Sequence, residues 1–134
     1  MTVNFGVNYL AVIVATIAVM VIGFVWFRPQ VFGSRWMAYI GKPGQQMRPG
    51  PDFVIAIAAG FVNAWTLALF SLNLGGSTIA DGVALGVLVW LGFFATTFAA
   101  TNVFAKRSWG LFGIDAGHAL VGQVVMGAIV TVWR

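Results

Sequence analysis

The stretch from Trp109 to Trp133, WGLFGIDAGHALVGQVVMGAIVTVW, decides the fold of this chain. It is long enough to cross a bilayer, because about 20 apolar residues at roughly 1.5 Å per residue span about 30 Å of hydrocarbon. Its only ionisable side chains are Asp115 and His118. Tryptophans at its two ends match the two aromatic belts of a membrane protein. The stretch is therefore expected to be a transmembrane helix.

Three other apolar runs have the same character. The first ends at Arg28-Pro29, because a charge is costly in lipid and the residue before a proline is pushed out of helical geometry. The third begins near Thr78 and Asp81, a hydroxyl and an acid that favour a helix N-terminus. The expected spans are about residues 8–27, 53–74, 78–104 and 109–133. The sequence thus predicts an all-α, polytopic membrane four-helix bundle forming a single transmembrane domain, residues 1–134.

Composition supports a membrane protein and excludes several other classes. Of the 134 residues, 60% are hydrophobic and 7% are charged, whereas soluble domains carry about 25% charged residues. The formal charge of +4 comes from Lys and Arg at the ends of apolar runs, which indicates membrane topology and not nucleic-acid binding. The chain contains no cysteine, so disulfides, thiolate metal sites and cysteine nucleophiles are excluded.

The positive charges also predict an orientation, because cytoplasmic loops are enriched in Lys and Arg. Two connections, one after the first span and one after the third, carry Arg28, Arg35, Lys42, Arg48, Lys106 and Arg107. Arg134 at the carboxyl terminus is the exception. We expect a multi-pass protein of the bacterial inner membrane, with both termini outside the cytoplasm.

The first connection contains a short amphipathic element. Phe32, Trp36 and Tyr39 share one face at helical spacing, which predicts a helix of about residues 31–40 lying in the cytoplasmic interface. The residues expected at lipid head groups or at this interface are Arg28, Arg35 and Trp36.

Small residues at four-residue spacing indicate close helix packing. They are Ala56, Gly60, Ala64 and Ala68 in the second span, Gly82 and Gly86 in the third, and Gly113 and Gly117 in the fourth. Such stripes let a second backbone approach to van der Waals contact. They could pack within one chain, or one stripe could form the interface of a homo-oligomer or larger membrane complex.

Asp115 and His118 lie three residues apart, on one helical face. An ionised carboxylate at membrane depth costs a few kcal/mol, so Asp115 should face protein or a water-filled cleft, or be protonated. From its depth it could reach Lys106, Arg107 or Arg28. Three interpretations stay open. Asp115 could lock helices together, the pair could carry protons or bind a cation, or His118 could ligate haem or a pigment.

The other polar groups indicate no enzyme. A ligand cleft or proton pathway, if there is one, is expected to be lined by Asp115, His118, Asn63, Thr97 and Thr101. There is no serine-histidine-acid set, no second histidine for zinc and no phosphate-binding glycine loop. We therefore expect no catalytic residue, no metal site and no resident cofactor.

Several segments form longer motifs near the two ends and the middle of the chain. They are Asn8-Tyr9-Leu10-Ala11-Val12, Gly23, Trp26-Phe27-Arg28-Pro29, Phe32-Gly33 and Trp36, then Trp90-Leu91-Gly92-Phe93, then Ile114-Asp115-Ala116-Gly117-His118, Leu120-Val121-Gly122 and Met126-Gly127-Ala128-Ile129. Together they resemble the bacterial family called domain of unknown function 1761. The resemblance implies a small four-span membrane protein without an assigned activity.

Two functional hypotheses lead. The first is a non-enzymatic membrane protein that is oligomeric or serves as an accessory subunit of a larger membrane complex. The second is a small proton-coupled transporter built around Asp115 and His118, and haem or pigment binding through His118 is a third. The lipid bilayer is an expected partner in all three, and nucleic acid is a partner in none.

Overall fold

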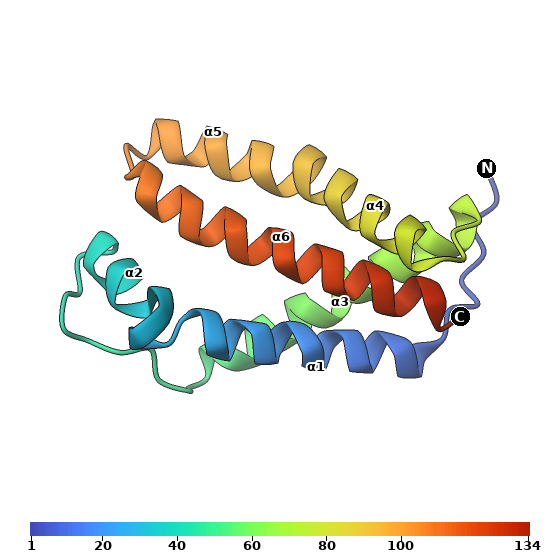
Figure 1. Ribbon diagram of the computed structural model, residues 1–134, viewed down its shortest axis with the longest axis horizontal. Coiled ribbons are helices and arrows are strands. Elements are labelled where there is room, and N and C mark those ends of the chain that lie inside the picture. The colour runs from blue at the N-terminus through green and yellow to red at the C-terminus, as the bar shows by residue number, and fades with distance from the viewer.

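The computed structural model describes every residue from Met1 to Arg134, and all its regular elements are helical (Figure 1). The elements are α1 (Tyr9–Trp26), the π-helical η1 (Pro29–Gly33), α2 (Ser34–Tyr39), α3 (Asp52–Leu74), α4 (Ile79–Val89), the π-helical η2 (Trp90–Ala95), α5 (Thr96–Phe104) and α6 (Trp109–Val132). Four stretches are long and apolar enough to cross a membrane, with α4, η2 and α5 together forming the third. The expected all-α bundle is confirmed.

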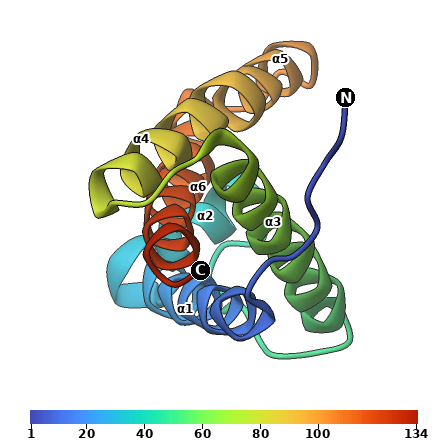
Figure 2. The same ribbon diagram turned by 90° about the vertical axis from the view of Figure 1, so that its right-hand side faces the viewer.

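The last helix, α6, is the central element of the fold. It packs against α1, α3 and α4, and it also contacts α2, η2 and α5. Figure 2, which looks along the helices, shows α6 between α4 on one side and α1 on the other, with α3 beside it. Within the most apolar part of each span, 44% of residues are buried in α6, against 28%, 22% and 6% in the first, second and third spans. The stretch that decides the fold is therefore also the most buried of the four spans, and it shares the core with α1 and α3.

Close approach of α4 to α6 depends on glycine. A Cβ atom on Gly82 would collide with the backbone of Gly127 and Ala128, and one on Gly86 would collide with the backbone of Gln123. The two backbones thus touch, as the small-residue spacing of the third span indicates. Gly82 and Gly86 lie in a contact within the chain, so they are not available to a second subunit.

The other small residues divide into packed and open positions. Gly60 faces side chains of α1, and a Cβ atom added to it would lie 3.4 and 3.5 Å from atoms of Met20 and Val19. Ala64 is fully buried in the core, and Gly117 lies under the Trp26 ring. Ala56 is exposed, and a Cβ on Gly113 would have no neighbour within 4 Å. The two open positions pack against no helix of the same chain.

The third span changes its helical type at Trp90. Its first part, α4, lies on α6, whereas its last part, α5, has its main contacts only with η2 and α6 and leans away from α3 (Figures 1 and 2). Between them lies η2, a π-helical segment, which contains an extra residue per turn and is rare in proteins. Neither π-helical segment was expected from the sequence.

Side-chain caps fix the ends of the helices. Thr78 and Asp81 form a reciprocal capping box at the start of α4, which confirms the expected helix start there. Gly75 ends α3 in the left-handed region with φ 76°, a conformation that favours glycine. Asn73 exchanges two hydrogen bonds of 2.8 and 3.0 Å with the backbone of Asn4. The N-terminal segment is thereby attached to the end of α3.

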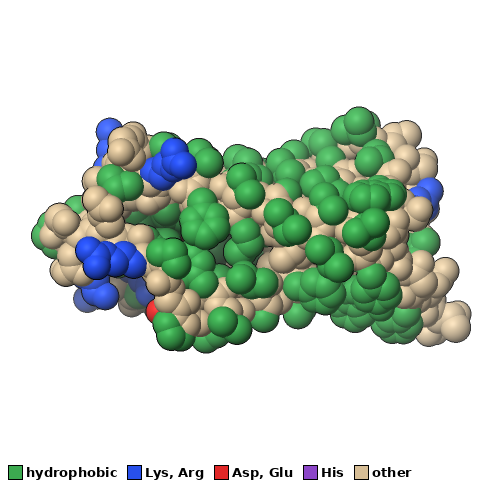
Figure 3. Space-filling model, turned by 90° about the horizontal axis from the view of Figure 1, so that it is seen from below, with side chains coloured by type: hydrophobic (Ala, Val, Ile, Leu, Met, Phe, Trp, Pro, Cys, Tyr) green, Lys and Arg blue, Asp and Glu red, His purple; other side chains and the backbone are tan.

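The two ends of the bundle differ in charge. Both chain termini and the α3–α4 turn lie at one end, here called the terminal end (Figure 1). The connection from α1 to α3 and the turn from α5 to α6 lie at the other, here called the basic end because six of the seven Lys and Arg residues belong to it. Figure 3 shows these basic side chains gathered at one end of a surface that is otherwise largely apolar.

The glycine contact between α4 and α6 leads to a stability prediction. Gly82→Ala should destabilise the protein by about 1–3 kcal/mol, because the new methyl group overpacks a backbone contact that cannot move without separating the helices. Gly113→Ala is the matched control, since its methyl group enters open space. The measurement is the thermal unfolding midpoint in detergent. Equal midpoints for the two variants would contradict the prediction.

Candidate functional site

Three tryptophans from three elements donate their indole N–H groups to one turn of α6. The hydrogen bonds run from Trp26 to the Ile114 carbonyl (3.1 Å), from Trp36 to the Asp115 carboxylate (2.9 Å) and from Trp90 to the Ala116 carbonyl (2.8 Å). We call residues 114–116 the tryptophan-bound turn. An indole N–H in an apolar environment requires an acceptor, so each bond ties its element to α6.

The turn after α1 brings two of these tryptophans to α6. Arg28 is extended, with φ −63° and ψ 145°, as expected for the residue before a proline, and α1 therefore ends. The Gly33 amide then donates to the Arg28 carbonyl at 2.9 Å. A side chain on Gly33 would overlap the Phe27 carbonyl, so only glycine permits this tight reversal. The chain turns back, and α2 carries Trp36 toward Asp115.

Asp115 is half-buried, and its hydrogen-bond partner is Trp36. Of the two kinds of contact considered for this carboxylate, a hydrogen bond and an ion pair, the structure contains the hydrogen bond. Arg107 is near enough to act on it electrostatically, but Arg107, Lys106 and Arg28 are all exposed. The physical reason is the returning α2, which places the Trp36 indole against the carboxylate. Asp115 faces protein, as the cost of a charge in lipid requires.

His118 lies in an aromatic box between α1 and α6. Its ring centroid is 5.1 Å from that of Phe27 and 6.2 Å from that of Trp26. Its Nε2 atom is buried without a hydrogen-bond partner and faces Gly23, where an added Cβ would lie 3.4 Å away. The imidazole thus shares a helical face with Asp115 but has entirely different neighbours.

The surroundings of His118 do not fit a haem. The Nε2 atom, through which the imidazole would bind an iron, is buried and faces Gly23. No group of three or more His, Cys, Asp or Glu side chains comes together that could hold a metal ion. The residues of this site can donate and accept hydrogen bonds, and Asp115 can carry a charge.

The other residues considered for a cleft wall lie elsewhere. Thr97 and Thr101 are exposed on α5, which leans away from α3 (Figure 2). Asn63 is half-buried in the middle of α3. The divergence of the third span from α3 separates these side chains, so only Asp115 and His118 of the five are near neighbours.

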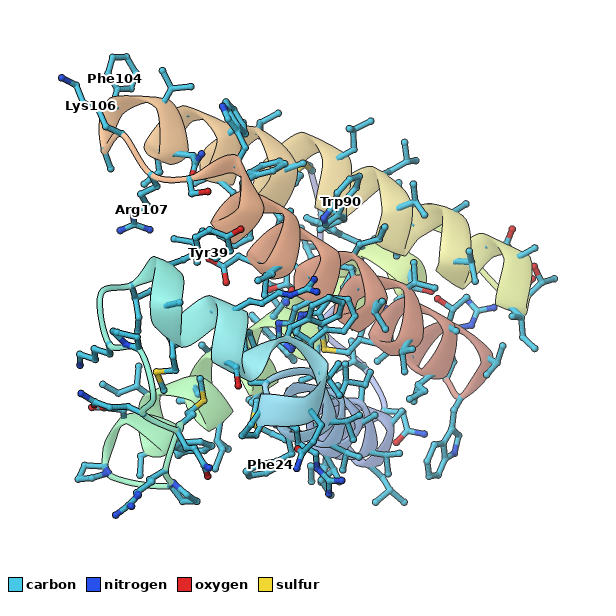
Figure 4. The ribbon with its side chains drawn as sticks, turned by 60° about the vertical axis from the view of Figure 1, so that its left-hand side comes forward. Phe24, Tyr39, Trp90, Phe104, Lys106 and Arg107 are labelled. Carbon is cyan, nitrogen blue, oxygen red and sulfur yellow. The ribbon has the colours of Figure 1, made fainter.

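An open cleft lies beside the tryptophan-bound turn, between α2 and the start of α6. Its volume is about 250 Å³, and its lining residues are Phe32, Arg35, Tyr39, Gly110, Gly113 and Ile114. Figure 4 shows Tyr39 directed toward the first turn of α6, and Trp90 of η2 lies beside α6 farther along that helix. We call this space the α2–α6 cleft.

Sequence reasoning did not find the roles of several residues at this site. The position of Trp90 deep within a span, away from either aromatic belt, is a signal that could have identified it as a hydrogen-bonding residue. Asn102 is buried and closes the α5–α6 turn, donating to the Arg107 carbonyl at 3.1 Å and accepting from the Arg107 amide at 3.0 Å. A buried amide near a helix end is a comparable signal.

The hydrogen bond between Trp36 and Asp115 can be tested by a double-mutant cycle. Trp36→Phe removes the donor and should cost about 1–3 kcal/mol, because the half-buried carboxylate is left without a partner. Asp115→Leu should cost a similar amount, and the double variant should cost less than the sum of the two. Asp115→Asn is the matched control, since its amide oxygen can still accept the bond. Additive losses of thermal stability in detergent would contradict the prediction.

A family model described as protein of unknown function (DUF1761) matches residues 10–131, which is most of the chain. No curated protein and no solved structure matches this chain. The motifs at the two ends of this match contain Trp26, Trp36 and the tryptophan-bound turn, and the resemblance seen in the sequence is confirmed. The chain belongs to the DUF1761 family.

Proposed function

We propose that this protein is a non-enzymatic membrane subunit that assembles through its third span, with copies of itself or with a larger membrane complex. The observation that carries the proposal is the surface of that span. Only 6% of its most apolar stretch is buried within the chain, although Gly92, Thr96 and Ala100 recur on its exposed side at four-residue spacing. We call these three residues the association face.

The association face has the chemistry of a helix contact in lipid. Small residues let a second helix approach closely, and hydroxyl groups can bond across the contact. Thr97 and Thr101 lie next to this face and are also exposed. A small side chain that faces lipid adds little to stability. It becomes favourable when it lets a second helix approach to van der Waals contact.

The surroundings of Asp115 and His118 support a structural role for them. The Trp36 indole donates a hydrogen bond to the Asp115 carboxylate, and protein atoms surround the His118 imidazole. A group that carries protons needs a connection to water on each side of the membrane. Both residues instead lie where they fix the packing of α1 and α2 on α6.

We further propose that the basic end faces the cytoplasm of a bacterial inner membrane and that both termini lie outside. The support is the concentration of Lys and Arg in the two connections at the basic end, since positive charge in short loops sets orientation.

Cross-linking tests the association face. The chain contains no cysteine, so single cysteines can be introduced into an otherwise natural background. Ala100→Cys should give a covalent dimer on oxidation in membranes, because the association faces of two copies would meet. Ile17→Cys, on an α1 position that is 57% exposed, is the control and should remain monomeric. Equal cross-linking of both variants would argue against a specific face, as would a monomer in lipid that binds no partner.

Cysteine labelling tests the orientation. In right-side-out membrane vesicles, Ser77→Cys should react with a membrane-impermeant maleimide, because it lies in the α3–α4 turn at the terminal end. Gln45→Cys, in the exposed connection at the basic end, should react only after permeabilisation. The reverse pattern would overturn the orientation.

A proton-coupled carrier is the second candidate, and one observation favours it. The His118 Nε2 atom is buried without a partner on the same helical face as Asp115, and a histidine in this state could exchange a proton with a transient water. Asp115→Asn in liposomes separates the two functions. An assembled protein that loses a proton flux present in the natural protein would favour the carrier, whereas the absence of any flux from the natural protein would remove it.

A further inference from the structure

The α2–α6 cleft has two walls of different character. Phe32, Arg35 and Tyr39 follow one another at about one-turn intervals along η1 and α2. Gly110 and Gly113 lie one turn apart on α6. The neighbouring hydrogen bond from Trp36 to Asp115 joins α2 to α6. The opening is therefore held at a fixed width by a bond that lies next to it, and it does not depend on a mobile loop.

The two glycines of the cleft do different things. A Cβ on Gly110 would overlap the Tyr39 hydroxyl and ring, so this glycine lets Tyr39 lie directly against α6. A Cβ on Gly113 would have no neighbour within 4 Å, so this glycine leaves space empty. Packing within the chain accounts for Gly110 but not for the space beside Gly113.

The cleft carries a positive charge that no acid of the chain neutralises. Arg35 lines it and is exposed. Of the three acids, Asp81 caps α4 at the terminal end and Asp52 lies in the first turn of α3. Asp115 lies beside the cleft, and the neutral indole of Trp36 does not cancel the charge of a carboxylate. Arg107 is the arginine that acts on Asp115 electrostatically, and Figure 4 shows it on the same side of the start of α6 as Tyr39. Arg35 is therefore the cation of the cleft that has no acidic partner.

The position and lining of the cleft select its ligand. It lies at the first two turns of α6, at the end of the membrane-spanning bundle, which is the depth of lipid phosphate groups. Arg35 and Tyr39 supply hydrogen-bond donors, whereas Phe32 and Ile114 supply an apolar surface. Guanidinium groups are well suited to phosphate because of their planar set of donors. A ligand with one phosphate joined to an apolar chain matches both halves.

We propose that the α2–α6 cleft is a binding site for one anionic glycerophospholipid, whose phosphate is held by Arg35 and Tyr39 and whose acyl chain passes beside Gly113. Either a lipid or free inorganic phosphate could supply the phosphate group. The apolar lining of the cleft favours the lipid. This site depends on the membrane placement of the chain and not on the subunit role proposed above. Failure of the association face would therefore leave it untouched.

Native mass spectrometry of the delipidated full chain in detergent tests the proposal. With phosphatidylglycerol and phosphatidylcholine added separately, the natural protein should retain one phosphatidylglycerol with about tenfold tighter binding than phosphatidylcholine. Both lipids present a phosphate, but the positively charged choline group of phosphatidylcholine is repelled by Arg35. Gly113→Leu should reduce the binding of phosphatidylglycerol about tenfold, because its side chain fills the cleft. Gly50→Leu is the matched control, since a Cβ there also has no neighbour within 4 Å, and it should bind as the natural protein does.

A second variant tests the charge without altering the space. Arg35→Gln should remove the preference for phosphatidylglycerol over phosphatidylcholine, whereas Arg28→Gln, which removes an exposed arginine outside the cleft lining, should preserve the preference. Equal lipid retention by Gly113→Leu and Gly50→Leu would overturn the site. Displacement of the lipid by millimolar inorganic phosphate would overturn the lipid as its ligand. Loss of the preference in Gly50→Leu as well would show that the preference does not arise in the cleft.

Discussion

The packing of the helices in this protein depends on indole N–H groups, which need hydrogen-bond acceptors where water is scarce. Three of them meet at one turn of α6, and each arrives from a different element. Water cannot satisfy a donor inside hydrocarbon, so separating η2 from α6 would leave the Trp90 indole without an acceptor. Hydrophobic burial cannot supply this specificity, because lipid tails are as apolar as the side chains that would be buried.

Much of the fold follows from the sequence because membrane solvation imposes simple rules. Apolar length places the four spans, proline and charge end α1, and Thr78 with Asp81 starts α4. The small-residue spacing at Gly82 and Gly86 indicates a close helix contact, and the structure identifies its partner as α6. These features depend on local sequence, which is why they could be anticipated.

The site could be anticipated only in part, since it depends on how distant segments meet. Asp115 and His118 are evident as costly groups within a span, but Trp36 as the carboxylate's partner depends on the reversal at Gly33. Thr97 and Thr101 have polar side chains that would suit the wall of a cleft with His118. They lie on the outer surface instead, because α5 diverges from α3. The α2–α6 cleft is visible only once Gly110 and Gly113 are seen opposite Arg35.

The π-helical segment in the third span has a consequence for how its two halves can diverge. One additional residue in a helical turn rotates everything beyond it by about 100° about the axis. The surface of α5 is therefore set in a different direction from the one that a regular continuation of α4 would give it. The direction of α5 is thus set at η2, whereas the glycine-mediated backbone contact with α6 lies in α4, so one span carries an inner packing surface and a separately directed outer one.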